Sequence, residues 1–110
     1  MDSPVKSGYN LARMRYSIVL SPEAIEDLRR LKPPRRSEVK QAMETHLRHE
    51  PEKVSKSRIK RLRGIRCPAY RLRVGEVRIF YDVSESTVEI LAIIPKSEAN
   101  PWLQSIQESP

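Results

Sequence analysis

Three arginines lie on one face of a predicted β-hairpin in the second half of this 110-residue chain. Gly75 and Glu76 separate two runs of alternating side chains, and this spacing predicts a two-residue loop with glycine at its first position. The loop pairs Arg73 with Arg78 and places Arg71 on the same face, because alternate residues of a strand point to opposite sides. The other face is apolar and consists of Tyr70, Leu72, Val74, Val77, Ile79 and Tyr81.

Like charges that face each other across two strands destabilise a sheet. We therefore interpret the face that carries Arg71, Arg73 and Arg78 as a binding site for an anion. Arginine suits this purpose because its guanidinium is permanently charged and donates paired hydrogen bonds to phosphate oxygens.

The basic residues of the chain are concentrated in one segment. The chain carries a net charge of +7, whereas residues 53–78 contain ten lysines and arginines and one acid, which gives this segment +9 and leaves −2 elsewhere. A localised basic patch is typical of proteins that bind the backbone of a nucleic acid. For residues 53–63 alone, a solvated charged surface with a basic loop is an equally supported interpretation.

The composition is that of one small globular domain, with 32% charged and 38% hydrophobic residues. No apolar run approaches the roughly 18 residues of a membrane span, and the N-terminal residues lack the apolar region of a secretory signal. The single cysteine, Cys67, excludes a disulfide within the chain. We therefore expect a cytoplasmic protein without a membrane partner, in which residues 1–13 are a disordered extension and residues 14–110 form a single domain.

The hydrophobic periodicity predicts an α+β domain with the order β-α-α-β-β-β. A first strand at residues 16–20 precedes Ser21-Pro22-Glu23, which combines a capping serine, a proline suited to the first turn and an acid. Pro33-Pro34 ends this helix, and a second helix is predicted from about Ser37 to His49. The short connection makes the two helices an αα-hairpin, and it packs on one face of a small, mainly antiparallel sheet.

The last predicted strand, residues 87–94, is apolar on both sides, which is typical of an interior strand. The polar tail after Pro95 is expected to contain a short packed turn with Trp102, Leu103 and Ile106. Strict alternation along the strand places Val88, Ile90, Ala92 and Ile94 on one face and Leu91 and Ile93 on the other.

Three stretches of the chain match a known pattern. They are Arg15-Tyr16-Ser17-Ile18 leading into Ser21-Pro22-Glu23-Ala24, then Leu62-Arg63-Gly64, and then YRLRVGEVRIFY from Tyr70 to Tyr81. The last of these is similar to the hairpin pattern YRxRxGxxRxxY, and with them the chain resembles the RelE/ParE superfamily of toxins from bacterial and archaeal toxin–antitoxin pairs. The resemblance extends from about Met14 to Leu103 and implies a RelE-like fold.

The resemblance also implies a function, namely that of the toxin in such a pair. The RelE branch, which we favour, consists of metal-free endoribonucleases that need no cofactor and cleave mRNA, often on the ribosome, to arrest translation. A small acidic antitoxin neutralises such a toxin by forming a hetero-oligomer with it. The alternative is the ParE branch, whose members inhibit DNA gyrase without enzymatic activity, and a plain RNA-binding module is a third possibility.

In the nucleases of this superfamily the RNA 2′-hydroxyl attacks the adjacent phosphate, while the protein transfers protons and stabilises the transition state. The resemblance places Arg71, Arg73, Arg78 and Lys96 at catalytic positions. Arginine keeps its proton in proteins, so Lys96 is the candidate for proton transfer. The residues expected to bind RNA are Lys60, Arg61, Arg63 and Trp102.

Three side-chain types leave alternatives open. Trp102 can stack on a base but cannot transfer a proton, and anchoring of the tail to the sheet is an equally supported function. His46 and His49, three positions apart, would need Cys67 to complete a metal site, and this weak spacing lacks an acidic ligand, so we expect no metal. For Cys67 itself a structural position is favoured over a reactive thiol.

Overall fold

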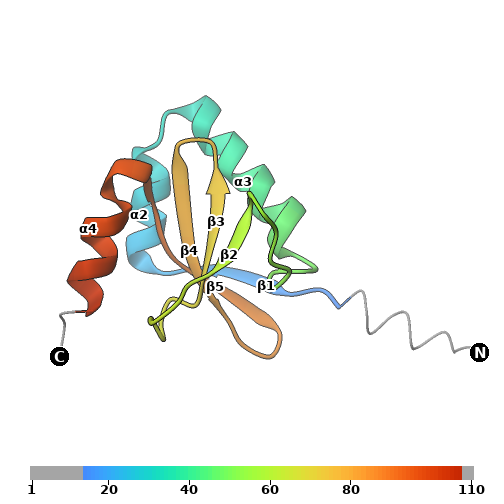
Figure 1. Cartoon of the computed structure of the whole chain (residues 1–110). Helices are drawn as coiled ribbons and strands as arrows, with labels where there is room; N and C mark the ends of the chain where they lie inside the picture. The colour runs from blue at the N-terminus through green and yellow to red at the C-terminus, as the bar shows by residue number, and fades with distance from the viewer. Residues whose placement is uncertain (1–13, 108–110) are drawn as a thin grey trace, which may run out of the picture.

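The computed structural model describes residues 14–107 and shows a five-stranded sheet with the order β1-β5-β4-β3-β2 (Figure 1). The predicted extension, residues 1–13, lies outside the described residues. Strand β1 (Ser17–Leu20) is parallel to β5 (Thr87–Pro95), and the other neighbouring strands are antiparallel. This arrangement confirms the predicted α+β class and the interior position of the last strand.

Two helices form the predicted αα-hairpin. Helix α2 (Pro22–Arg30) starts as expected, because Ser21 Oγ accepts a hydrogen bond from the backbone N–H of Ala24 at 3.1 Å. Helix α3 (Pro33–Leu47) begins earlier than the predicted Ser37, and its first two residues are prolines. Proline suits the first turn because the N–H groups there have no acceptor within the helix, so the N–H that proline lacks is not missed. None of the helices within residues 14–107 is long and apolar enough to span a membrane.

The β-hairpin of β3 (Tyr70–Val74) and β4 (Val77–Val83) has the predicted register throughout, with Arg73 opposite Arg78. Its apolar face packs under α2 and α3 and forms the main core, where Tyr70 and Tyr81 stack with ring centroids 5.5 Å apart. The helices contribute Ala24, Val39, Met43 and Leu47 to this core. The arginine face of the hairpin therefore points away from the αα-hairpin.

Strand β5 departs from strict alternation because its pairing with β4 shifts. Phe80 lies opposite Ala92, whereas Tyr81 lies opposite Ile90, so Leu91 is an extra residue in β5. The predicted faces of this strand are wrong beyond that point, since an extra residue reverses the side to which later side chains point. Val88, Ile90 and Ile93 pack in the main core, and Ala92 and Ile94 pack on the opposite face.

Two elements extend the predicted order. Edge strand β2 (Ile59–Arg61) pairs with β3, and helix α4 (Lys96–Gln107) takes the place of the expected short turn. Strand β2 has three residues, two of them charged, so its sequence shows no period and only the pairing with β3 makes it a strand.

Helix α4 forms despite Pro101, which removes one helical hydrogen bond. Tertiary packing compensates, because an amphipathic helix gains most of its stability from its contacts with the rest of the fold. These contacts form a second, smaller core between α4 and the arginine face of the sheet. Its residues are Leu62, Phe80, Ala92, Ile94, Ala99, Trp102 and Leu103.

A carboxylate from α2 completes the hydrogen bonding of β5 beside the irregularity. The pairing of β1 with β5 ends at Leu20 and Ile90, so the next part of β5 has no strand on that side. Asp27 Oδ2 accepts a hydrogen bond from the N–H of Ile93 at 3.0 Å, and Ser21 Oγ donates to the carbonyl of Leu91 at 3.3 Å. The first helix is thereby fixed to the sheet.

The substitution Asp27→Ala should lower the free energy of unfolding by about 2 kcal/mol, because it leaves the N–H of Ile93 without its acceptor. The matched control is Glu26→Ala, because the Glu26 side chain is 58% exposed and forms a surface ion pair with Arg29. Such a pair contributes at most about 1 kcal/mol. Urea denaturation of both variants measures the difference, and equal losses would contradict this function of Asp27.

Candidate functional site

A groove of about 690 Å³ lies between the arginine face of the sheet and α4. Its lining includes apolar side chains such as Phe80 and Leu103 and the amide of Asn100, and no acidic side chain among residues 14–107. We call it the cationic groove after the five basic residues that line it, which are Lys60, Arg63, Arg71, Arg78 and Lys96.

The register of the sheet explains why residues distant in sequence meet in the cationic groove. Lys60 in β2 lies opposite Arg71 in β3, and Arg71 lies opposite Phe80 in β4. Residues that face each other across antiparallel strands point to the same side of the sheet. Lys60 therefore reaches the groove only because the unpredicted strand β2 exists.

Lys96 reaches the groove from the other side, as the first residue of α4. It is exposed, and its backbone N–H donates to the carbonyl of Glu76 in the hairpin loop at 2.7 Å. This bond fixes the start of α4 beside the loop that connects the arginine-bearing strands. Lys96 thus lines the same groove as Arg71 and Arg78.

Arg71 is half-buried and forms no ion pair with a described residue. Its Nε–H is buried and has no hydrogen-bond partner. Burial, followed by the positive charges of Arg78 and Arg73, lowers the pKa of Arg71 below its ordinary value. A buried donor without an acceptor destabilises the folded state, and an anionic oxygen in the groove would satisfy it.

Arg78 has a structural function in addition to lining the groove. Its side chain is buried, with 8% of the residue exposed, and Nη1 donates to the carbonyls of Gly75 at 2.8 Å and Val77 at 3.1 Å. These bonds hold the hairpin loop and account for both Nη1 hydrogens. The Nε and Nη2 groups remain as donors for a ligand.

Three of the residues predicted from the sequence do not line the cationic groove. Arg61 lies on the opposite face, where Nη1 donates to the hydroxyl of Tyr70 at 3.2 Å and the guanidinium lies 5.1 Å from the ring centroid. Trp102 stacks on Phe80 with centroids 5.0 Å apart, which is the anchoring contact considered as the alternative to base stacking. Arg73 is exposed and lines a separate hollow beside the hairpin loop.

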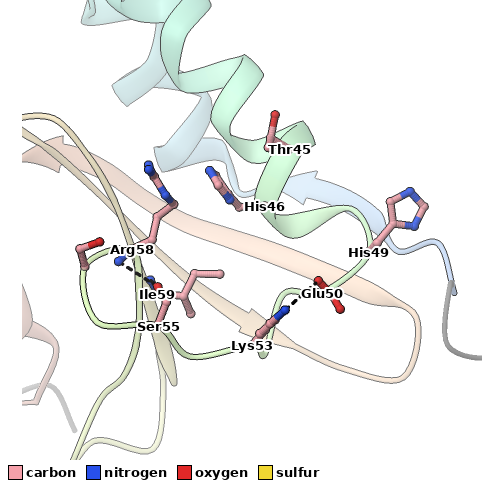
Figure 2. Close-up of a pocket in the computed structure, with 9 residues that line it drawn as sticks. Thr45, His46, His49, Glu50, Lys53, Ser55, Arg58 and Ile59 are labelled. Carbon is pink, nitrogen blue, oxygen red and sulfur yellow. Dashed lines mark hydrogen bonds and ion pairs between the residues drawn. The ribbon is translucent and has the colours of Figure 1, made fainter.

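The histidines line another hollow, of about 370 Å³, between the end of α3 and residues 50–59 (Figure 2). His46 is half-buried on the side of Arg58, and burial, followed by the charge of Arg58, lowers the pKa of His46. His49 is exposed and its ring is turned away from Arg58, with Nδ1 3.2 Å from the carbonyl oxygen of Met14. No group of three histidine, cysteine, aspartate or glutamate side chains within residues 14–107 is placed to hold a metal.

The thiol of Cys67 has a structural contact. Its Sγ donates to Asp82 Oδ2 at 2.7 Å, and Asp82 Oδ1 accepts from the N–H of Ala69 at 2.6 Å. This hydrogen bond to a carboxylate, together with burial, raises the pKa of the Cys67 thiol to about 11. The thiol is therefore protonated at neutral pH, which makes it a poor nucleophile.

The substitution Arg71→Met should leave the free energy of unfolding unchanged or raise it by about 1 kcal/mol, because it removes an unsatisfied buried donor and a repelling charge. Arg78→Met should lower it by about 2 kcal/mol, because two backbone carbonyls lose a charged donor. The two variants are matched controls for each other, since both lose one arginine from the same groove. Chemical denaturation distinguishes them, and a marked loss in Arg71→Met would show that Arg71 supports the fold.

Comparisons with known proteins agree with this architecture. The family model described as ParE toxin of type II toxin–antitoxin system, parDE, matches residues 18–100. No curated protein matches the chain in sequence. The chain is similar in structure to the toxin–antitoxin complex RelBE2 from Mycobacterium tuberculosis, with 28% sequence identity and a TM-score of 0.63, over 74% of this chain and 99% of that chain.

Two archaeal structures show the same fold. One is the RelE–RelB complex from Pyrococcus horikoshii OT3, with 23% identity and a TM-score of 0.62 over 76% of this chain and 97% of that chain. The other is the RelB–RelE complex from Methanococcus jannaschii, with 19% identity and a TM-score of 0.58 over 76% and 96%. The matched residues cover β1 apart from its first residue, the αα-hairpin, the other strands of the sheet and the start of α4. The chain therefore belongs to the ParE toxin family of type II toxin–antitoxin systems, within the RelE/ParE superfamily.

Proposed function

We propose that this toxin is a metal-free endoribonuclease that cleaves mRNA on the ribosome and so arrests translation. The observation that carries the proposal is the cationic groove, in which five basic side chains meet without an acid and the Nε–H of Arg71 lacks an acceptor. A phosphodiester of RNA supplies the missing charge and the missing acceptor together. The ribosome would hold the mRNA strand in place for a domain that is too small to order it alone.

The reaction requires one proton acceptor and one proton donor. The RNA 2′-oxygen attacks the adjacent phosphorus, its proton passes to the neutral amine of Lys96, and the bond from phosphorus to the 5′-oxygen breaks. The departing oxygen takes a proton from the ammonium of Lys60, which leaves a cyclic phosphate and a 5′-hydroxyl. Arg71 and Arg78 stabilise the negative charge that develops on the phosphate oxygens.

The choice of Lys96 and Lys60 follows from the residue types that line the groove. Its other basic side chains are arginines, which keep their protons and can only bind or stabilise a charge. The two lysines reach it from different elements, Lys60 from β2 and Lys96 from the start of α4. We therefore assign the base to Lys96 and the acid to Lys60.

A non-enzymatic inhibitor of DNA gyrase is the second candidate function. The observation in its favour is the family model itself, which describes ParE toxins. The absence of histidine and carboxylate side chains from the lining of the cationic groove also favours a binding function over turnover. The arginine face of the hairpin argues against this function, because it carries all three arginines of the superfamily hairpin pattern YRxRxGxxRxxY.

We further propose that a small acidic antitoxin binds this toxin in a hetero-oligomer. The similar structures from Mycobacterium tuberculosis and Pyrococcus horikoshii are complexes of a toxin with its antitoxin. Residues 53–78 of this chain carry +9, and an acidic segment that folds on binding would neutralise them.

The substitution Lys96→Arg tests the proposed reaction. Arginine keeps the positive charge but cannot accept the proton, so we expect normal RNA binding and cleavage slowed about a hundredfold or more. Primer extension on mRNA translated in vitro measures cleavage, and Lys40→Arg on the exposed surface of α3 is the matched control.

Full cleavage by Lys96→Arg would show that Lys96 only contacts phosphate.

A supercoiling assay with purified gyrase decides between the two functions. Inhibition of gyrase by a protein that leaves mRNA intact would establish the second candidate and overturn the first.

A further inference from the structure

A hollow of about 220 Å³ beside the hairpin loop is separate from the cationic groove and is lined by Ser57, Arg58, Arg73 and Gly75. We propose that this loop hollow is a second phosphate subsite, which binds a neighbouring phosphodiester of the single-stranded RNA that occupies the groove. The inference rests on the proposed function and names the path that the substrate takes beyond the reacting phosphate.

Two arginines line the loop hollow, and a third approaches the hairpin loop beside it. Arg58 precedes β2 and Arg73 lies in β3, and the N–H of Arg73 donates to the carbonyl of Arg58 at 2.9 Å, which holds their backbones side by side. Arg35 of α3 reaches the same loop, since a Cβ added at Gly75 would lie 2.9 Å from Arg35 Nη1. With φ of 58°, Gly75 has a backbone conformation that favours glycine, and its lack of a side chain leaves room for this guanidinium.

The charges around the loop hollow are not balanced within it. Arg35 approaches Glu38 at 3.7 Å, whereas Arg58 and Arg73 are exposed and form no ion pair with a residue in the described range 14–107. Two unpaired guanidinium groups with a serine hydroxyl are a set of donors that matches the oxygens of a phosphate.

The lining also favours a phosphodiester over a protein segment. Within the described part of the chain no apolar side chain lines the loop hollow, whereas a docked helix or strand of a protein would bury apolar anchors. Arginine and serine side chains without an apolar surface are typical of contacts with a nucleic-acid backbone. RNA is therefore the occupant that the residues fit.

The loop hollow lies next to the cationic groove. Arg73, which lines the hollow, is directly opposite Arg78, which lines the groove, so paired residues of β3 and β4 line the two sites. On its far side the loop hollow shares Ser57 and Arg58 with the hollow near His46. Figure 2 shows the Arg58 side chain extending toward His46 and α3. The cations thus mark a path from α4, past the hairpin loop, toward the end of α3.

Two non-cleavable 2′-O-methyl RNAs test this subsite. One is a strand of about twelve nucleotides, within the range that a small single-strand-binding surface covers. The other is a dinucleotide, whose single phosphodiester occupies the groove alone. Fluorescence anisotropy at several salt concentrations measures binding of the strand, and NMR shift titration measures binding of the dinucleotide.

The variant Arg58→Ala keeps the backbone hydrogen bonds of residue 58 and removes only its side chain. We expect it to bind the strand about fivefold to tenfold more weakly, with the slope of log K against log salt smaller by about 0.7, which is the effect of one lost phosphate contact. Binding of the dinucleotide should be unchanged. Arg58→Lys should restore the slope, because it restores the charge.

The matched control is Arg66→Ala, since Arg66 is exposed in the same basic segment and lines neither the groove nor the loop hollow. If both alanine variants bound the strand more weakly to the same extent, only the overall charge of the protein would determine binding, and the subsite would be overturned. The subsite would also be overturned if Arg58→Ala bound the twelve-nucleotide strand as tightly as the unchanged protein does. The same holds if Arg58→Ala bound the strand normally but bound an acidic peptide more weakly. If the unchanged protein binds neither RNA, both the proposed function and the subsite fail. If Arg71→Met abolishes binding of the dinucleotide while Arg58→Ala changes the binding of neither RNA, only the subsite fails.

Discussion

The antiparallel pairing of β3 with β4 places Arg73 opposite Arg78 and Arg71 next to them on one face, and the site depends on this concentration of like charge. The fold relieves the repulsion only in part. Arg78 donates to two carbonyls at the hairpin loop, whereas Arg71 is half-buried with an unsatisfied Nε–H. Destabilising arrangements of this kind persist where a ligand completes them, so the same residues explain both the cost to the fold and the capacity to bind an anion.

The rest of the sheet holds this charged face in position. The opposite face of the hairpin is anchored in the main core under α2 and α3, which fixes the register that brings the arginines together. The irregularity at Leu91 turns Ala92 and Ile94 toward the arginine face, where α4 packs on them. Helix α4 thereby forms the second wall of the cationic groove and carries Lys96 to it.

The parts of the fold that the sequence predicts are those fixed by local chemistry. Gly75-Glu76 determines the hairpin register, and Ser21-Pro22 determines the start of α2, so both predictions are confirmed. Strand β2 and helix α4 depend on tertiary partners, because the first has no period of its own and the second contains Pro101. The shift in β5 has no local marker either, since Leu91 is as apolar as its neighbours.

The same distinction applies to the candidate site. The shared face of Arg71, Arg73 and Arg78 follows from strand alternation, which a sequence displays directly. The separation of Lys60 from Arg61 requires β2, whose pairing turns one toward the groove and the other toward Tyr70. The backbone bonds of Arg78 and the loop hollow at Arg58 arise from contacts around Gly75 that no residue spacing indicates.

We expect a phosphodiester oxygen to complete the hydrogen bonding of the Arg71 Nε–H group. NMR of arginine Nε–H groups, recorded during titration with non-cleavable single-stranded RNA, measures this directly. Arg36 is the internal reference, because its Nε already donates to the carbonyl of Leu28 at 3.4 Å, away from the groove. When RNA binds, the Arg71 Nε–H signal should shift and exchange more slowly with solvent, while the Arg36 signal stays in place. RNA binding that leaves the Arg71 signal unchanged would contradict it.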